Sequence, residues 1–137
     1  MKAAVRVLDS YSIIAYVEGE AGKDTMIEVF RSARDSGRHC LLSVVNWGEV
    51  YCITLREAGQ QKADEVAHLI RTLPIHLVPV DFELAKQAAV FKASKKMSYA
   101  DCFAAAQAKH RRVELVTGDK EFKQVEGEIM IMWLGLV

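Results

Sequence analysis

The chain has 137 residues, 51% hydrophobic and 26% charged, with only 2 prolines, a composition typical of a packed globular protein and unlike a disordered or fibrous one. Eighteen basic residues balance eighteen acidic ones, which excludes a protein that coats nucleic acid through bulk positive charge. The length fits a single domain, residues 1–137, whose core needs no disulfide or structural metal.

Short β-branched runs alternate with longer stretches of helical period, which predicts an α/β protein with a mainly parallel sheet. Four main strands and a weaker fifth are expected, at residues 4–8, 39–44, 76–80, 113–116 and 129–133. Helices are expected at residues 22–36, 46–58, 61–72, 82–94 and 99–110. Gly37 follows the first of these helices as a residue that can adopt positive φ, so it predicts a sharp stop.

Four acidic residues follow predicted strands or begin predicted helices. Asp9 directly follows the first strand and Asp119 comes shortly after the fourth, whereas Glu49 and Asp101 lie about one turn into helices. Right-handed crossovers between parallel strands bring the loops after the strands to one edge of the sheet, where open α/β folds bind ligands. We therefore expect the four carboxylates at one edge.

Uncompensated carboxylates repel one another at short range, and a hard divalent cation removes that conflict. Mg²⁺ takes one or two carboxylates directly and keeps waters and substrate phosphate oxygens. The cation lowers the pKa of a bound water and offsets charge that develops on a phosphate. Four gathered carboxylates would therefore favour phosphodiester hydrolysis.

Each of these acids also has a purely structural interpretation. Asp9 and Asp119 can be helix N-caps, and Ser98-x-x-Asp101 and Asn46-x-x-Glu49 have the spacing of capping boxes. Thr25-x-x-Glu28 has the same spacing, and for Glu28 we expect helix support alone. Spacing by itself leaves the structural and the catalytic interpretations open.

Four segments, taken in order, resemble the successive signatures of the PIN domain family, in particular its VapC-type toxin ribonucleases. They are VLDSYSIIAYVEGE (7–20), LSVVNWGEVYCI (42–53), MSYADCFAAAQAK (97–109) and ELVTGDKEF (114–122). The resemblance implies a three-layer PIN-like fold with a central, mainly parallel sheet of four to five strands flanked by helices. It also implies a Mg²⁺- or Mn²⁺-dependent endoribonuclease, the toxin of a toxin-antitoxin pair.

The resemblance assigns roles to residues of this chain. It implies that Asp9, Glu49, Asp101 and Asp119 are the catalytic and metal-binding carboxylates. Thr117 matches a catalytic-pocket hydroxyl, Ser10 a second one, and Asn46 a polar position one turn before Glu49. The implied partners are substrate RNA, an antitoxin that binds near helices 46–58 and 61–72, and a second copy in a symmetric dimer.

Other features of the sequence limit the cell compartment and the kind of site. Cys40, Cys52 and Cys102 contain no C-x-x-C pair, so neither a disulfide framework nor a thiolate zinc site is expected, and a reducing cytoplasm suits them. No apolar run approaches 18 residues, so neither a membrane span nor secretion is expected. The four histidines lack metal-binding spacing and are expected at the surface.

Several basic residues are candidates for phosphate contacts. Lys120 adjoins Asp119, and Lys92, Lys95 and Lys96 precede the Asp101 helix. The basic run at residues 109–112 is expected at the amino ends of the strands, far from the pocket.

Two other functions remain open. Phosphoryl transfer through an aspartyl intermediate at Asp9 is the first, although haloacid-dehalogenase-like enzymes need an acid two residues on, where this chain has Tyr11. A non-catalytic PIN-like module that binds RNA or protein is the second, and the presence of all four acids argues against it.

Overall fold

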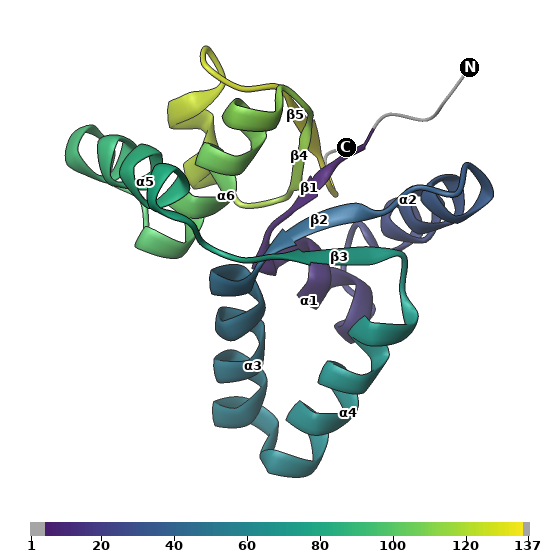
Figure 1. The fold of residues 1–137 in the computed structure, drawn as a ribbon. Coiled ribbons are helices and arrows are strands. Elements are labelled where there is room, and N and C mark those ends of the chain that lie inside the picture. Colours follow the sequence, from purple (N-terminus) through teal and green to yellow (C-terminus); the bar gives the residue numbers. More distant parts are fainter. Residues whose placement is uncertain (1–4, 136–137) are drawn as a thin grey trace.

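The computed structural model describes residues 5–135. Five short strands form one sheet: β1 (Val7–Leu8), β2 (Cys40–Ser43), β3 (Ile75–Val78), β4 (Leu115–Thr117) and β5 (Ile131–Trp133). Their order is β3-β2-β1-β4-β5 and every neighbouring pair is parallel (Figure 1). This confirms the predicted α/β class with a parallel sheet, although the strand expected from residue 4 begins outside the described residues.

The helices flank this sheet. They are α1 (Ser10–Glu18), α2 (Lys23–Asp35), α3 (Val44–Ala58), α4 (Gln60–Thr72), α5 (Phe82–Ser94), α6 (Tyr99–Arg111) and the 3₁₀ helix η1 (Lys120–Val125). The five predicted helices correspond to α2 to α6, with ends within two residues of the prediction. Neither α1 nor η1 is among the predicted elements. In α1 (SYSIIAYVE) apolar residues are spread around the helix, so its sequence has no clear amphipathic face.

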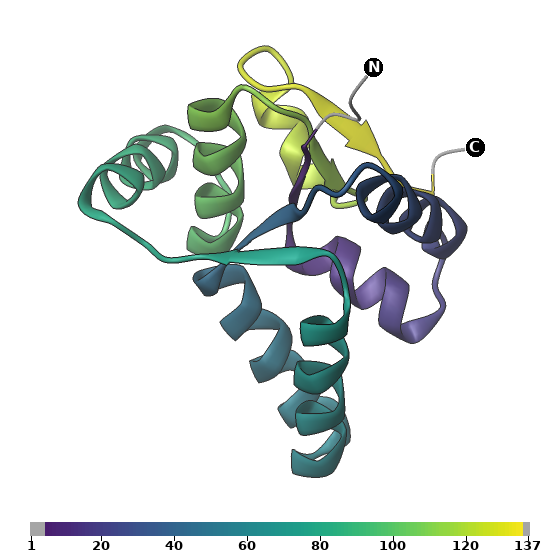
Figure 2. The same cartoon turned by 45° about the vertical axis from the view of Figure 1, so that its right-hand side comes forward.

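Two apolar cores cover the two faces of the sheet. Val7 packs in the core with α5, α6 and η1, whereas the next residue, Leu8, packs in the core with α1 to α4. This alternation follows from the opposite directions of successive side chains along a strand. Figure 2 shows α5 and α6 on one side of the strands and α1 and α2 on the other. Burial on both faces explains why β1, β2 and β4 are mostly apolar, whereas the edge strand β3 is only partly buried.

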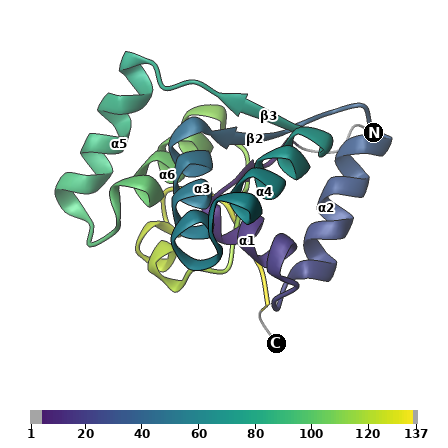
Figure 3. The same cartoon turned by 90° about the horizontal axis from the view of Figure 1, so that it is seen from below.

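Helices α3 and α4 form a hairpin that projects away from the sheet (Figures 1 and 3). Val50, Val66 and Ile70 are buried in it, whereas 39% of Leu55 is exposed. The Tyr51 hydroxyl donates to Asp64 Oδ1 at 2.7 Å and ties the two helices together. Part of the apolar surface of this pair is therefore buried within the chain.

The cysteines and histidines differ in their exposure to solvent. Cys40 and Cys102 are buried, Cys52 is exposed, and all three are free thiols. All four histidines are exposed, as predicted. Within residues 5–135, no helix combines the length and the apolar character needed to cross a bilayer.

Candidate active site

Asp9 joins the central strand to the first helix. It follows β1, is fully buried, and is the N-cap of α1, where its Oδ1 accepts from the backbone N–H of Ser12 at 2.9 Å. Its Oδ2 accepts a short hydrogen bond from the hydroxyl of Thr117. One oxygen of Asp9 therefore caps the helix, as the structural interpretation expects. The other oxygen is hydrogen-bonded to strand β4, more than a hundred residues away in the sequence.

Thr117 connects Asp9 to Asp119. It is the last residue of β4, which pairs with β1, and its side chain is fully buried. Its hydroxyl donates to Asp9 and accepts from the backbone N–H of Asp119 at 3.1 Å. Asp119 is the N-cap of η1 and accepts from the N–H of Glu121 at 3.0 Å. One hydroxyl thus fixes the two acids that follow adjacent strands.

Glu49 lies on α3, which begins earlier than the sequence suggests. Ser43 is its N-cap and accepts from the N–H of Val45 at 3.1 Å, so the capping-box interpretation of Asn46 and Glu49 is wrong. Glu49 instead accepts a short hydrogen bond from the Ser10 hydroxyl of α1. Because the cap is elsewhere, the carboxylate of Glu49 is not required for starting the helix.

Asp101 and Asn46 lie where α3 and α6 meet. Ser98 caps α6 by accepting from the N–H of Asp101 at 3.1 Å, as its spacing predicts, and the Asp101 side chain is only 6% exposed. The Nδ2 of Asn46 donates to the carbonyl of Ala100 at 3.0 Å. The helices that carry Glu49 and Asp101 are therefore joined one residue from Asp101.

A cavity of about 370 Å³ lies at the carboxyl edge of the sheet. Its lining contains Glu49, Asp101 and Asp119, with Ser10, Tyr11, Ile14, Glu20, Ile53, Ser98 and Glu121. Asp9 is too deeply buried to line it but is bonded to Thr117 beside Asp119. No lysine or arginine is among these lining residues, so the negative charge has no basic counterpart there.

Two lining carboxylates, Glu20 and Glu121, are absent from the sequence-based site. Glu20 follows the unpredicted helix α1, and Glu121 lies in the unpredicted η1. The sequence does contain a signal for Glu121, because it comes two residues after Asp119, but its direction depends on a 3₁₀ geometry that the pattern does not reveal.

The electrostatics of the two most buried carboxyls reflects this gathering of charge. Burial raises the pKa of Asp9 from 3.8 to about 7, against the opposing hydrogen bonds from Thr117 and Ser12. Burial also raises the pKa of Asp101 to about 7, and the negative charges of Asp119, Asp9 and Glu49 add to the increase. The charges of Asp119, Asp9 and Glu49 therefore reach Asp101 and oppose its ionisation.

The cavity offers carboxylate oxygens to a divalent cation. Within the described part of the chain, no three or more Asp, Glu, His or Cys side chains are positioned to hold one ion jointly. An all-protein cage is thus not preformed. The oxygen donors of an acidic, open cavity without basic lining residues still fit Mg²⁺ or Mn²⁺, because Mg²⁺ typically takes one or two carboxylates and completes its coordination with water.

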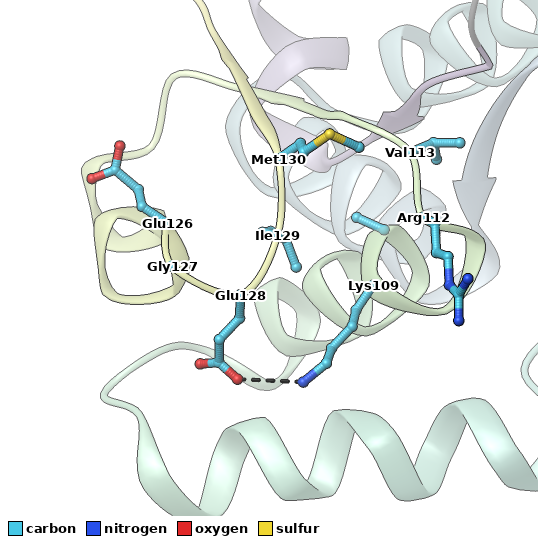
Figure 4. Close-up of a pocket in the computed structure, with 9 residues that line it drawn as sticks. Lys109, Arg112, Val113, Glu126, Gly127, Glu128, Ile129 and Met130 are labelled. Atoms are coloured by element: carbon cyan, nitrogen blue, oxygen red, sulfur yellow. Dashed lines mark hydrogen bonds and ion pairs between the residues drawn. The ribbon is translucent and has the colours of Figure 1, made fainter.

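A second pocket lies at the C-terminal end of α6, and the basic run contributes to its lining (Figure 4). Lys109 and Arg112 line it, and Lys109 forms an ion pair with Glu128 at 3.4 Å. At 1.5 Å per residue, Lys109 lies about 12 Å along the helix from Asp101. This agrees with the expectation that the basic run is remote from the carboxylates.

Two of the lysines considered for phosphate contacts are engaged by the protein itself. Lys95 pairs with Glu128 at 3.3 Å, and the ammonium of Lys92 donates to the carbonyl of Met97 at 2.7 Å. Lys96 and Lys120 are exposed.

The chain belongs to the PIN domain family, which matches residues 6–128. No curated protein sequence matches it. Among solved structures it is similar to VapC20 of Mycobacterium tuberculosis, a toxin that cleaves the sarcin-ricin loop, with 17% identity and a TM-score of 0.71 over 88% of this chain and 94% of that one.

It is also similar to DNA-bound VapBC of Salmonella typhimurium, with 17% identity and a TM-score of 0.75, and to promoter-bound VapBC2 of Rickettsia felis, with 9% identity and a TM-score of 0.77. Each of these two matches covers 95% of this chain and 98% of the other. These identities are low, so the likeness shows only that the fold is shared. The chemistry has to be inferred from the residues of the site.

Proposed function

We propose that this chain is a Mg²⁺- or Mn²⁺-dependent endoribonuclease in which Asp9, Glu49, Asp101 and Asp119 form the active site. The observation that carries the proposal is the acidic cavity at the carboxyl edge of the sheet. Three of these acids line it, and the fourth is held behind it by Thr117. Burial is the main cause of the raised pKa values of Asp9 and Asp101, the neighbouring carboxylates add to it, and a bound cation would favour the ionised forms.

The bound cation would supply positive charge for a phosphodiester and for the water that attacks it. Asp101 and Asp119, which face the cavity, would hold the cation directly or through water. Glu49, oriented by Ser10, would accept a hydrogen bond from the attacking water. Thr117 would be a positioning residue, since its hydroxyl is buried and bonded to Asp9 and to the backbone of Asp119.

Membership in the PIN family and likeness to VapC and VapBC structures support a role as the toxin of a toxin-antitoxin pair. We expect an antitoxin to bind near the α3–α4 hairpin, which projects from the sheet and leaves Leu55 exposed. A second copy in a symmetric dimer is also expected. The free thiols Cys40 and Cys102 fit a single domain that works in a reducing cytoplasm.

The alternative is a PIN-like module that binds RNA or protein without cutting. The cavity lining argues against it, because a scaffold gains nothing from five carboxylates around an open cavity without a basic residue. Phosphoryl transfer through Asp9 is disfavoured because both oxygens of this buried carboxylate are hydrogen-bonded and Tyr11 occupies the position of the second acid.

The test is to incubate the purified chain with total cellular RNA and Mn²⁺ and to map the new RNA ends. Asp101→Asn should abolish cleavage. The matched control is Asp81→Asn, since Asp81 caps α5 by accepting from Leu84 N–H at 2.8 Å, as Asp9 caps α1, but lies outside the cavity lining. Cleavage that survives Asp101→Asn, or that Asp81→Asn also removes, would refute the proposed site.

A further inference from the structure

Tyr11 is an exposed aromatic side chain at the rim of the acidic cavity. It is the second residue of α1, lines the cavity beside Ser10 and Asp119, and is 37% exposed. The catalytic arrangement proposed above does not use it. A large apolar ring that is open to solvent at the mouth of an acidic pocket calls for a separate explanation.

The ring of Tyr11 is held in place by a close approach to Gly118. A Cβ atom at position 118 would lie 2.8 Å from Cζ of Tyr11 and closer still to Cε1. Gly118 does not have a positive φ, so glycine is needed there for space rather than for backbone conformation. The loop between Thr117 and Asp119 therefore supports one side of the ring.

The ring of every other tyrosine contacts another aromatic ring of the same chain. Each pairs with an aromatic neighbour: Tyr16 with Phe30 at 5.0 Å, Tyr51 with Trp47 at 5.3 Å, and Tyr99 with Phe103 at 5.5 Å between ring centroids. Among the described residues Tyr11 takes part in no such pair. Its ring is therefore still available to an aromatic ligand.

The charge around Tyr11 also favours an uncharged contact with RNA. The cavity lining has five acidic residues and no basic one, and the net charge of the chain is zero, so phosphate attraction contributes little to holding RNA at this point. An uncharged contact is needed, and stacking of an unpaired base on an aromatic ring supplies one. Ile14 and Ile53 extend the apolar part of the same lining.

We propose that Tyr11 is a stacking platform for an unpaired nucleobase of the RNA next to the phosphodiester that enters the cavity. The inference rests on the proposed function and names the residue that binds the base. A ring supported by Gly118 at the rim holds the base outside the cavity and leaves the carboxylates to the phosphate. The substrate at this position is therefore single-stranded.

The first test measures binding without catalysis. Fluorescein-labelled single-stranded RNA is titrated with metal-free protein in EDTA, and the dissociation constant is read from fluorescence anisotropy. Tyr11→Ala and Tyr11→Leu should weaken binding roughly 5- to 100-fold, the range for loss of one stacked base, and Tyr11→Phe should bind like wild type. Tyr99→Ala is the matched control, because Tyr99 is 49% exposed but lies outside the cavity lining.

The second test places the contact on a base. A series of RNAs is used, each with an abasic nucleotide at a different position. At one position wild type and Tyr11→Ala should have equal dissociation constants, because the base that stacks on Tyr11 is absent. Gly118→Ala, which displaces the ring without removing it, should weaken binding to intact RNA as well.

Equal affinities of wild type and Tyr11→Ala for intact RNA would overturn the inference. So would a Tyr11→Ala deficit that is the same at every abasic position, or wild-type protein that binds no RNA in EDTA, since stacking needs no cation. The proposed function is judged separately by cleavage of total RNA in Mn²⁺. If wild type cleaves total RNA but binds RNA no more tightly than Tyr11→Ala does, the stacking platform alone is refuted. If wild type shows neither cleavage nor a difference in affinity from Tyr11→Ala, the nuclease is refuted as well.

Discussion

The buried carboxyl of Asp9 makes a quantitative prediction about the metal-free protein. Its pKa is about 7 in the folded chain against 3.8 as the ordinary value, so between these values the folded state binds the proton and the unfolded state does not. Stability from this group is therefore complete below about pH 4 and is lost as the pH rises to 7. A shift of about three units at 1.36 kcal/mol each corresponds to about 4 kcal/mol.

The perturbation is Asp9→Asn, whose amide does not titrate in this range. In EDTA, we expect the free energy of unfolding of the wild type, relative to that of Asp9→Asn, to fall by about 4 kcal/mol between pH 4 and pH 8. The measurement is chemical denaturation across this pH range. Asp81→Asn controls for the loss of a capping carboxylate alone.

Mn²⁺ at pH 8 should reverse the effect in wild type but not in Asp9→Asn, because binding to the folded state adds stability only where the site is complete. Curves for wild type and Asp9→Asn that run parallel from pH 4 to pH 8 would refute the reasoning from burial.

Three further predictions concern residues that position the site or the fold. Thr117→Val should raise the pKa of Asp9 further, because it removes a hydrogen bond that lowers this pKa, and it should slow RNA cleavage at least tenfold. Thr117→Ser keeps the hydroxyl and should be close to wild type in both pH titration and activity. Asn46→Ala should lower the free energy of unfolding by about 1–3 kcal/mol in denaturation, because a buried bond from α3 to α6 is lost. Gly22→Ala should destabilise by more than about 1 kcal/mol, since φ is 98° and the new Cβ would lie 2.9 Å from that of Leu134; an unchanged melting temperature would contradict this.

The parallel sheet and most helices could be predicted because burial on both faces leaves a clear pattern. Val7 and Leu8 face opposite cores, so β1 must be apolar throughout, and α2 has one apolar face and is followed by Gly37, which marks its end. The hydrophobic pattern of the sequence did not predict helix α1. It starts at Asp9 without a loop and has no polar face that would distinguish it from the preceding strand.

The edge of the sheet at which the acids lie followed from the expected parallel strands and right-handed crossovers, but the detailed contacts of the acids did not. The cap of α3 at Ser43 and the contribution of Glu20 depend on helix starts and ends that a sequence gives only approximately. The contact between Tyr11 and Gly118 joins residues more than a hundred positions apart, and no local pattern encodes it.

The central claim is that acids from four distant segments build one site for a divalent cation and its bound water, and calorimetric titration of the metal-free protein with Mn²⁺ at pH 8 tests it most directly. We expect saturable binding in wild type and in Asp81→Asn, and none in Asp101→Asn. Equal Mn²⁺ binding by wild type and Asp101→Asn, or no binding by wild type, would contradict the account.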